Sequence, residues 1–124
     1  MWWWRKPPRT AWQRAEDLAA RHLQLQGYKI IARNLFCGRN ELDIVALKGD
    51  TTVFVEVRSR TANDHIRPED SIGPQKQRKL LSAARIYMRR HPDDKMYYRF
   101  DVIAVAPGPD GTPELTHYED AFRA

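Results

Sequence analysis

The sequence has little of what several protein classes require. Its 124 residues include a single cysteine, Cys37, so the chain can form neither an internal disulfide nor a cysteine zinc site. No apolar stretch approaches the ~20 residues that are needed to span a bilayer. The sequence also shows no repeat and no low-complexity segment. These features favour a reducing compartment, and we expect a cytoplasmic protein without membrane attachment.

The N-terminus lacks the pattern of a secretion signal. The aromatic run in "MWWWRKPP" is too short for a signal-peptide core, and the basic residues follow it instead of preceding it. We expect residues 1–9 to form a flexible leader and residues 10–124 to form a single domain. The alternative is that the three tryptophans contact a membrane interface or a protein partner.

Acidic residues are fewer than basic ones. The 16 acidic and 21 basic residues give a formal net charge of +5 and a pI of about 9.6. This balance favours phosphate-bearing partners such as nucleic acid, although many basic proteins bind none. With 42% hydrophobic and 30% charged residues, the composition is typical of a folded domain. The length suits one core of two or three layers.

Hydrophobic periodicity predicts two helices and five strands. Apolar residues recur at helical spacing over residues 10–26 and from residue 74 to about residue 90. Shorter apolar segments predict strands at 28–34, 41–48, 51–59, 97–105 and, as a short edge strand, 115–120. A turn or short irregular link at 35–40 and a mobile polar loop at 60–73 separate some of them. The order is α-β-β-β-α-β-β, which indicates an α/β fold with a mixed sheet flanked by helices.

Two acidic residues interrupt the apolar strands at 41–48 and 51–59. Between these strands lies Gly49-Asp50, which suits a two-residue hairpin turn. Such a turn places Asp43 opposite Glu56, with Cβ atoms about 4.5–5.5 Å apart. Carboxylates this close repel, and either a divalent cation or a proton on one of them relieves the repulsion. We predict a Mg²⁺ or Mn²⁺ site at Asp43 and Glu56.

Two alternatives to this metal site stay open. A sheet face exposed to solvent tolerates acids freely, although the apolar neighbours on both faces argue for a covered sheet. A one-residue change in the loop would also turn the pairing to the other face.

Other residues belong with this acidic pair. The same register places Glu41 opposite Arg58. Either the two form an ordinary ion pair, or Arg58 is a cation that polarises a phosphate. Glu16 lies in an apolar row of the first helix, either at its edge or as a third ligand for metal or water. Asp101 interrupts an apolar strand as Asp43 does, and it either supports the metal site or is a structural acid. The four histidines show no ligand spacing.

The second predicted helix carries six cations and no acid. Such a face is either simply solvated or binds phosphates with release of counterions. Lys76 lies in a row that leads to Leu80 and Ala83, so it points toward the sheet more than the outer arginines do. We expect nucleic acid to contact Arg60, Arg67, Lys76, Arg78, Lys79 and Arg85.

The segment "ELDIVA" followed by "TTVFVEVRSR" resembles the D-(x)n-E-x-K core of the restriction-endonuclease-like superfamily. More closely, the chain resembles the YraN-like family of predicted endonucleases. The matches include "AE", "GY", "IARN", "ELDI" and "RFDV", and they span nearly the whole chain from Ala11. The resemblance implies a restriction-endonuclease-like fold and a Mg²⁺-dependent endonuclease acting on DNA. A remoter similarity to archaeal Holliday-junction resolvases adds branched or structured DNA to the expected substrates.

The resemblance also implies site residues. Glu16 corresponds to the helix acid, Asp43 and Glu56 to the metal ligands, and Arg58 to the lysine of the motif. This departure puts the lysine's role in doubt, because an arginine stays charged and cannot act as a general base. Arg58 can still stabilise a phosphate, and Lys76 is a candidate for the missing amine.

Two further expectations follow. If cleavage was lost with the motif lysine, the chain is a nucleic-acid-binding module on the same fold. If the DNA is two-fold symmetric, we expect a homodimer, because symmetric sites pair with symmetric proteins.

Overall fold

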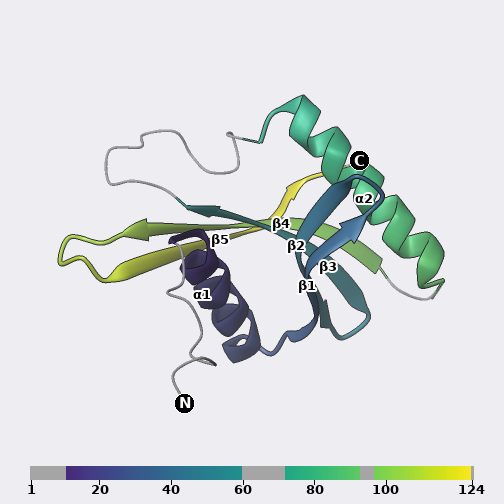
Figure 1. The fold of residues 1–124 in the computed structure, drawn as a ribbon. Coiled ribbons are helices and arrows are strands. Elements are labelled where there is room, and N and C mark those ends of the chain that lie inside the picture. Colours follow the sequence, from purple (N-terminus) through teal and green to yellow (C-terminus); the bar gives the residue numbers. More distant parts are fainter. Residues whose placement is uncertain (1–10, 60–71, 93–96, 124) are drawn as a thin grey trace, which may run out of the picture.

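In the computed structural model, two helices cover opposite faces of a five-stranded sheet (Figure 1). The structure describes residues 11–59, 72–92 and 97–123. The elements are α1 (Ala11–Leu25), β1 (Lys29–Cys37), β2 (Asn40–Lys48), β3 (Thr51–Ser59), α2 (Pro74–Arg90), β4 (Tyr97–Pro107) and β5 (Pro113–Phe122). The predicted α/β class and element order are confirmed, and the arrangement is consistent with a restriction-endonuclease-like fold.

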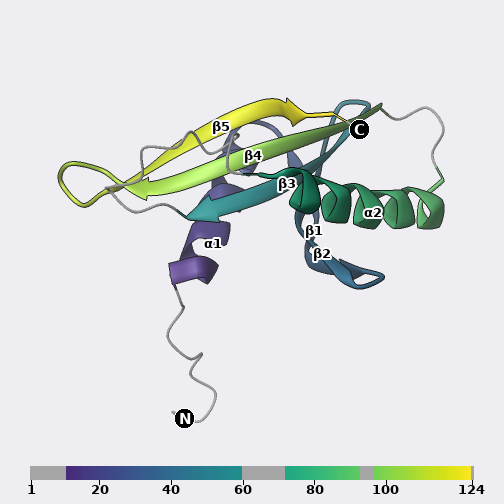
Figure 2. The ribbon, with the colours of Figure 1, turned by 90° about the horizontal axis from the view of Figure 1, so that it is seen from above.

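The strands lie in the order β1-β2-β3-β4-β5. All neighbouring pairs are antiparallel except β3 and β4, which are parallel. A parallel pair needs a long crossover connection, whereas antiparallel strands can be joined by a tight turn. The crossover between β3 and β4 contains α2, and it lays this helix on the face opposite α1 (Figures 1 and 2).

Side-chain alternation divides the core into two layers. The α1 layer includes Ala19, Leu23, Ile44, Val55 and Ile103. The α2 layer includes Phe54, Leu80, Ala84, Phe100 and Val102. Because successive side chains of a strand point to opposite faces, a strand covered on both sides is apolar at nearly every position. An acid in such a strand therefore lies in the protein interior.

The predicted β2–β3 hairpin is confirmed. Gly49 has a φ of 61°, a conformation that glycine adopts without steric cost, and Lys48 pairs with Thr51. The ladder runs from that pair to Ile44 and Val55 in the predicted register.

Two strand boundaries differ from the expectation. The predicted turn or link over 35–40 is shorter than expected, because β1 continues to Cys37 and the turn is confined to Gly38 and Arg39. Leu35 is half-buried, Phe36 is exposed and Cys37 is buried, which is the alternation of a strand. At the other sheet edge, β5 is longer than the predicted strand at 115–120.

Some expectations fall on residues outside the described part of the chain. These are the leader 1–9, the start of the first helix at residue 10, and most of the loop 60–73. Ile72 at the end of this loop is buried in the α2 layer. α2 then begins after Gly73 with Pro74 in its first turn, as predicted. Among the described residues, neither helix is long and apolar enough to cross a membrane.

Candidate metal centre

The β2–β3 ladder ends at the pair Ile44 and Val55. Beyond this pair, a side-chain carboxylate accepts a hydrogen bond from the backbone of β3. The N–H of Val57 donates a hydrogen bond to Asp43 Oδ2, with a distance of 2.9 Å. A buried N–H must find an acceptor, and here a side chain supplies one in place of a strand carbonyl. This bond holds the Asp43 carboxylate at the end of the ladder.

Asp43 and Glu56 come together as the hairpin register predicts. Both are buried, with 7% and 4% of their surface exposed, and the two carboxyl groups lie close enough for each to affect the ionisation of the other. Burial, followed by the charge of Glu56, raises the pKa of Asp43 to about 7, although the Val57 N–H and Lys76 act in the opposite direction. Two buried carboxylates this close repel each other, so the pair favours a proton or a cation between them.

Two glutamates from other positions approach Asp43. Glu16 on α1 is 1% exposed, and Glu41 lies near the start of β2. One carboxylate oxygen from each of Glu16, Glu41 and Asp43 lies within 4.8 Å of the others. Burial and the charges of Asp43 and Glu41 raise the pKa of Glu16, against the opposing effect of a hydrogen bond from Asn34. Asp43 therefore lies between two groups of acids, with Glu56 in one group and Glu16 and Glu41 in the other.

This cluster leaves carboxylate oxygens unsatisfied. Glu16 Oε2 and Glu56 Oε2 are buried, and neither has a hydrogen-bond partner among the described residues. A buried acceptor without a partner is unfavourable, and a hard divalent cation is the natural partner for a set of carboxylate oxygens. Carboxylate oxygens suit Mg²⁺ or Mn²⁺, but the three oxygens that lie within 4.8 Å of one another belong to Glu16, Glu41 and Asp43. The predicted ligand Glu56 lies near Asp43 outside this set, so its role as a ligand stays a prediction.

A cation on α2 reaches the acids. The distance from Lys76 Nζ to Glu56 Oε1 is 3.5 Å, and the Lys76 side chain is 41% exposed. Lys76 therefore points toward the sheet, as its helical row predicts. Lys76 and Lys79 line a pocket of about 190 Å³ together with Asn40, Glu41, Asp43 and Leu80. An anion entering this pocket would meet ammonium groups beside the carboxylates.

Arg58 lies two residues beyond Glu56 on β3, so both side chains point to the α2 side of the sheet. Arg58 is half-buried. The β2–β3 ladder does not extend as far as the expected pairing of Arg58 with Glu41, which stays a prediction. The sequence did not predict that Glu41 lies with Glu16 and Asp43 as a candidate metal ligand, because the hairpin register paired Glu41 with Arg58.

Sequence reasoning also missed Asn34. Its φ of 51° is left-handed, a conformation in which Asn is favoured over most other residues. Its neighbours Arg33 and Leu35 pair with Ile44 and Leu42, so Asn34 lies beside Asp43. Its side chain hydrogen-bonds Glu16. A polar residue inside the β1 sequence was the available signal.

The remaining predicted contacts lie along α2 or outside the described residues. Arg78, Lys79 and Arg85 are exposed on α2, whereas Arg60 and Arg67 belong to the segment that the structure does not describe. Their contacts with nucleic acid stay predictions.

Asp101 occupies a separate site. It accepts bonds from Arg99 at 2.8 Å, from the Asp120 N–H at 3.0 Å, and has its Oδ2 2.7 Å from His117 Nε2. Burial raises its pKa, but the bonds from His117 and Arg99 outweigh this effect and the net shift is downward. Asp101 shares the α1 side of β4 with Ile103, whereas Glu56 points to the α2 side. Of the two alternatives, Asp101 is the structural acid.

Comparisons with known proteins match the chain to one family. The model of "Uncharacterised protein family UPF0102" matches residues 15–105, which include the acidic cluster and Lys76. The chain is 42% identical over 107 residues to a UPF0102 protein of Anaeromyxobacter dehalogenans, covering 86% of this chain and 79% of that protein. It is 37% identical over 116 residues to a UPF0102 protein of Symbiobacterium thermophilum, covering 94% and 98%. A UPF0102 protein of Chlorobium phaeobacteroides is 38% identical over 114 residues, with coverage of 88% and 90%.

Proposed function

The chain belongs to the uncharacterised protein family UPF0102, as its YraN-like sequence features indicate, and we propose that it is a Mg²⁺- or Mn²⁺-dependent endonuclease that hydrolyses phosphodiester bonds in DNA. The family description names no reaction, so the proposal rests on the site. The observation that carries it is the convergence of acids on Asp43. Glu16 and Glu41 approach Asp43, Glu56 lies near it beside Lys76, and one buried oxygen each of Glu16 and Glu56 is unsatisfied.

The carboxylates have distinct proposed roles. Asp43 and Glu56 would hold the cation, because both carboxylates are buried and lie close enough for the charge of Glu56 to raise the pKa of Asp43. The cation would supply Lewis-acid polarisation of the phosphate and a more acidic bound water. Glu16 would ligate or orient that water. Its raised pKa suits it to accept a proton near neutral pH better than an ordinary carboxylate.

The cations would stabilise the negative charge that develops at the phosphate. Lys76 already lies against Glu56, and a cation bound there would release its ammonium group toward an incoming phosphate. Arg58 would contribute fixed positive charge from β3. Since Arg58 cannot accept a proton, proton transfer would fall to a carboxylate or to Lys76.

The outer face of α2 would bind the DNA backbone. Arg78, Lys79 and Arg85 are exposed, and the whole chain carries a net charge of +5. Phosphate contacts of this kind give affinity that falls steeply with salt but carry no sequence information.

A cleavage assay tests the proposal. Purified protein is incubated with a linear duplex and a four-way junction, with Mg²⁺, with Mn²⁺ or with EDTA. We expect cleavage that requires the metal and falls by about 100-fold or more in Asp43→Asn, which keeps an acceptor for the Val57 N–H. Asp50→Asn, at the exposed hairpin turn, is the matched control and should cleave normally.

The other outcomes are equally informative. Cleavage that survives in Asp43→Asn would assign the activity to another site or to a contaminant. Salt-dependent binding without any cleavage would favour the nucleic-acid-binding module in which catalysis was lost with the motif lysine.

A further inference from the structure

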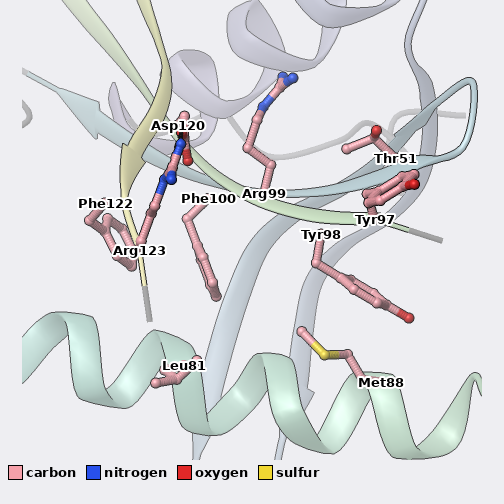
Figure 3. A pocket seen from close by; sticks show the side chains of 10 residues that line it. All are labelled: Thr51, Leu81, Met88, Tyr97, Tyr98, Arg99, Phe100, Asp120, Phe122 and Arg123. Atoms are coloured by element: carbon pink, nitrogen blue, oxygen red, sulfur yellow. Dashed lines mark hydrogen bonds and ion pairs between the residues drawn. The ribbon is translucent and has the colours of Figure 1, made fainter. Parts of the chain in front are cut away.

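An aromatic cleft of about 530 Å³ lies between α2 and the ends of β4 and β5 (Figure 3). Figure 3 shows Tyr98 and Phe100 pointing from β4 toward the helix, where Leu81 and Met88 point back toward the sheet. Phe122, at the end of β5, completes the apolar lining. The cleft is in the size range of small-molecule sites, and the proposed metal centre does not use it.

The cleft arises from the way that α2 covers the sheet. α2 packs mainly on β2 and β1, which leaves the ends of β4 and β5 less covered. Lys79 of the metal-centre pocket and Leu81 of the cleft lie on opposite sides of the buried stripe of α2. The helix therefore has an acidic site on one flank and an aromatic cleft on the other.

An irregularity in β5 shapes the wall of the cleft. Val102 pairs with Tyr118, and continued pairing would place Asp120 opposite Phe100, but Phe122 is there instead. The extra residues include Asp120, whose φ is 52° and whose N–H is bonded to the buried Asp101. Bulges often re-aim side chains beside functional sites. This one places the Phe122 ring against Phe100, with ring centroids 4.8 Å apart.

The rings in the cleft are held by a buried aromatic layer. Phe54 stacks on Tyr98 with an interplanar angle of 7° and lies 5.4 Å from the Phe100 ring. Phe54 and Phe100 are buried, whereas Tyr98 and Phe122 are partly exposed. The exposed rings therefore present fixed apolar surfaces, which suits a flat aromatic ligand.

Cations border the cleft. The Arg123 side chain is 82% exposed, and Arg85 is exposed one turn along α2 from Leu81. Asp120, the acid in the lining, is already bonded by Arg123. Since Arg123 and Asp120 neutralise each other, Arg85 and the net charge of +5 of the chain are what favour a polyanion over a second copy of the chain.

We propose that this cleft binds a nucleobase from an unpaired stretch of a nucleic-acid strand. The inference rests on the proposed nuclease function and names its substrate class, DNA with single-stranded segments. A base within a duplex is stacked on both sides and has no free face, whereas an unpaired base can stack on aromatic side chains.

The helix also sets the spacing between the two sites. Leu81 and Met88 follow Lys76 by about 8 and 18 Å along the helix axis, at 1.5 Å per residue. The bound base therefore lies a few nucleotides along the strand from the phosphate at the metal centre.

Binding measurements without catalysis test the proposal. Fluorescence anisotropy in EDTA compares a blunt duplex, a fork with unpaired arms, and the same fork with abasic arms. The variant Met88→Trp fills the cleft from α2 without removing a sheet residue, and Tyr98→Ala removes a ring. Ser82→Trp, on the exposed face of the same helix, is the matched control.

We expect Met88→Trp and Tyr98→Ala to weaken fork binding about tenfold while duplex binding stays constant. Abasic arms should reproduce this loss in the wild type. 2-Aminopurine in an unpaired arm should be quenched by the wild type and by Ser82→Trp, but not by Met88→Trp. Abasic arms bound as tightly as intact arms would overturn the proposal.

The controls separate this inference from the proposed function. Base-dependent fork binding with no cleavage in Mg²⁺ or Mn²⁺ would reject the nuclease and keep the cleft as a base site. Cleavage of duplex and fork alike, with no effect of the cleft variants, would reject the cleft alone. A dimer that becomes monomeric in Met88→Trp would show that the cleft is an interface between copies, which would also overturn the proposal.

Discussion

The ammonium group of Lys76 on α2 lies 3.5 Å from the carboxylate of Glu56 on β3. The residue that corresponds to the motif lysine lies two positions after Glu56 and is Arg58. The crossover from β3 to β4 carries Lys76 back to the same carboxylate. The structure thus brings a primary amine to the acidic pair from the helix, although β3 itself lacks one.

The variant Lys76→Met should lower kcat for DNA cleavage by about 100-fold, because it removes positive charge next to the scissile phosphate. Lys79→Met removes a charge from the same pocket and should mainly raise KM. Steady-state kinetics under identical conditions compare kcat and KM of the two variants. An equal change in kcat for both variants would contradict a specific role for Lys76.

The stability of the metal-free protein should depend on the ionisation of Asp43. Its folded-state pKa of about 7 lies above the ordinary value of 3.8, so the folded chain holds a proton that the unfolded chain has lost. The free energy of unfolding should therefore fall by a few kcal/mol as the pH rises from about 4 to about 7. Asp43→Asn cannot ionise and should lack this fall. Urea unfolding in EDTA across this pH range checks the difference, and parallel pH profiles would contradict it.

Divalent cations should stabilise the folded protein. Binding to the folded state alone adds about 2.7 kcal/mol at 100 times Kd. For a chain of this size, such a gain should raise Tm by several degrees. Thermal unfolding with Mg²⁺ or Mn²⁺ should show the rise in wild type and Asp50→Asn but not in Asp43→Asn. A similar rise in Asp43→Asn would place the bound cation elsewhere.

Asp101 should contribute to stability and not to metal binding. Its carboxylate accepts bonds from Arg99, and its removal leaves a partly buried guanidinium without this partner. Asp101→Ala should therefore lower the free energy of unfolding by about 3–5 kcal/mol, whereas the exposed Asp50→Ala should change it by less than about 0.5 kcal/mol. Chemical denaturation measures both effects. A folded Asp101→Ala protein without the Mn²⁺-dependent rise in Tm would show instead that Asp101 supports the metal centre.

Local signals in the sequence accounted for the hairpin and its acidic pair. Glycine at position 49 and two flanking apolar runs determine the turn, and the turn determines the register. The register then brings Asp43 to Glu56. The helical row of Lys76 likewise predicted its direction, since the residues along that row are buried against the sheet.

The rest of the site depends on tertiary structure. The end of the β2–β3 ladder at Ile44 and Val55 directs Asp43 to the Val57 N–H, and no local pattern marks that point. The approach of Glu41 to Glu16 depends on how α1 packs on the sheet. The bulge at Asp120 depends on the buried Asp101, which lies 19 residues earlier in a different strand. Neither periodicity nor turn chemistry reports such long-range contacts.

Anomalous X-ray scattering from crystals grown with Mn²⁺ tests the metal centre most directly. We predict one Mn²⁺ peak about 2.1 Å from oxygens of Asp43 and Glu56, with Glu16 as a direct or water-mediated ligand and with Lys76 displaced from Glu56. Density without Mn²⁺ at these acids, with Lys76 still beside Glu56 at saturating Mn²⁺, would contradict the metal centre.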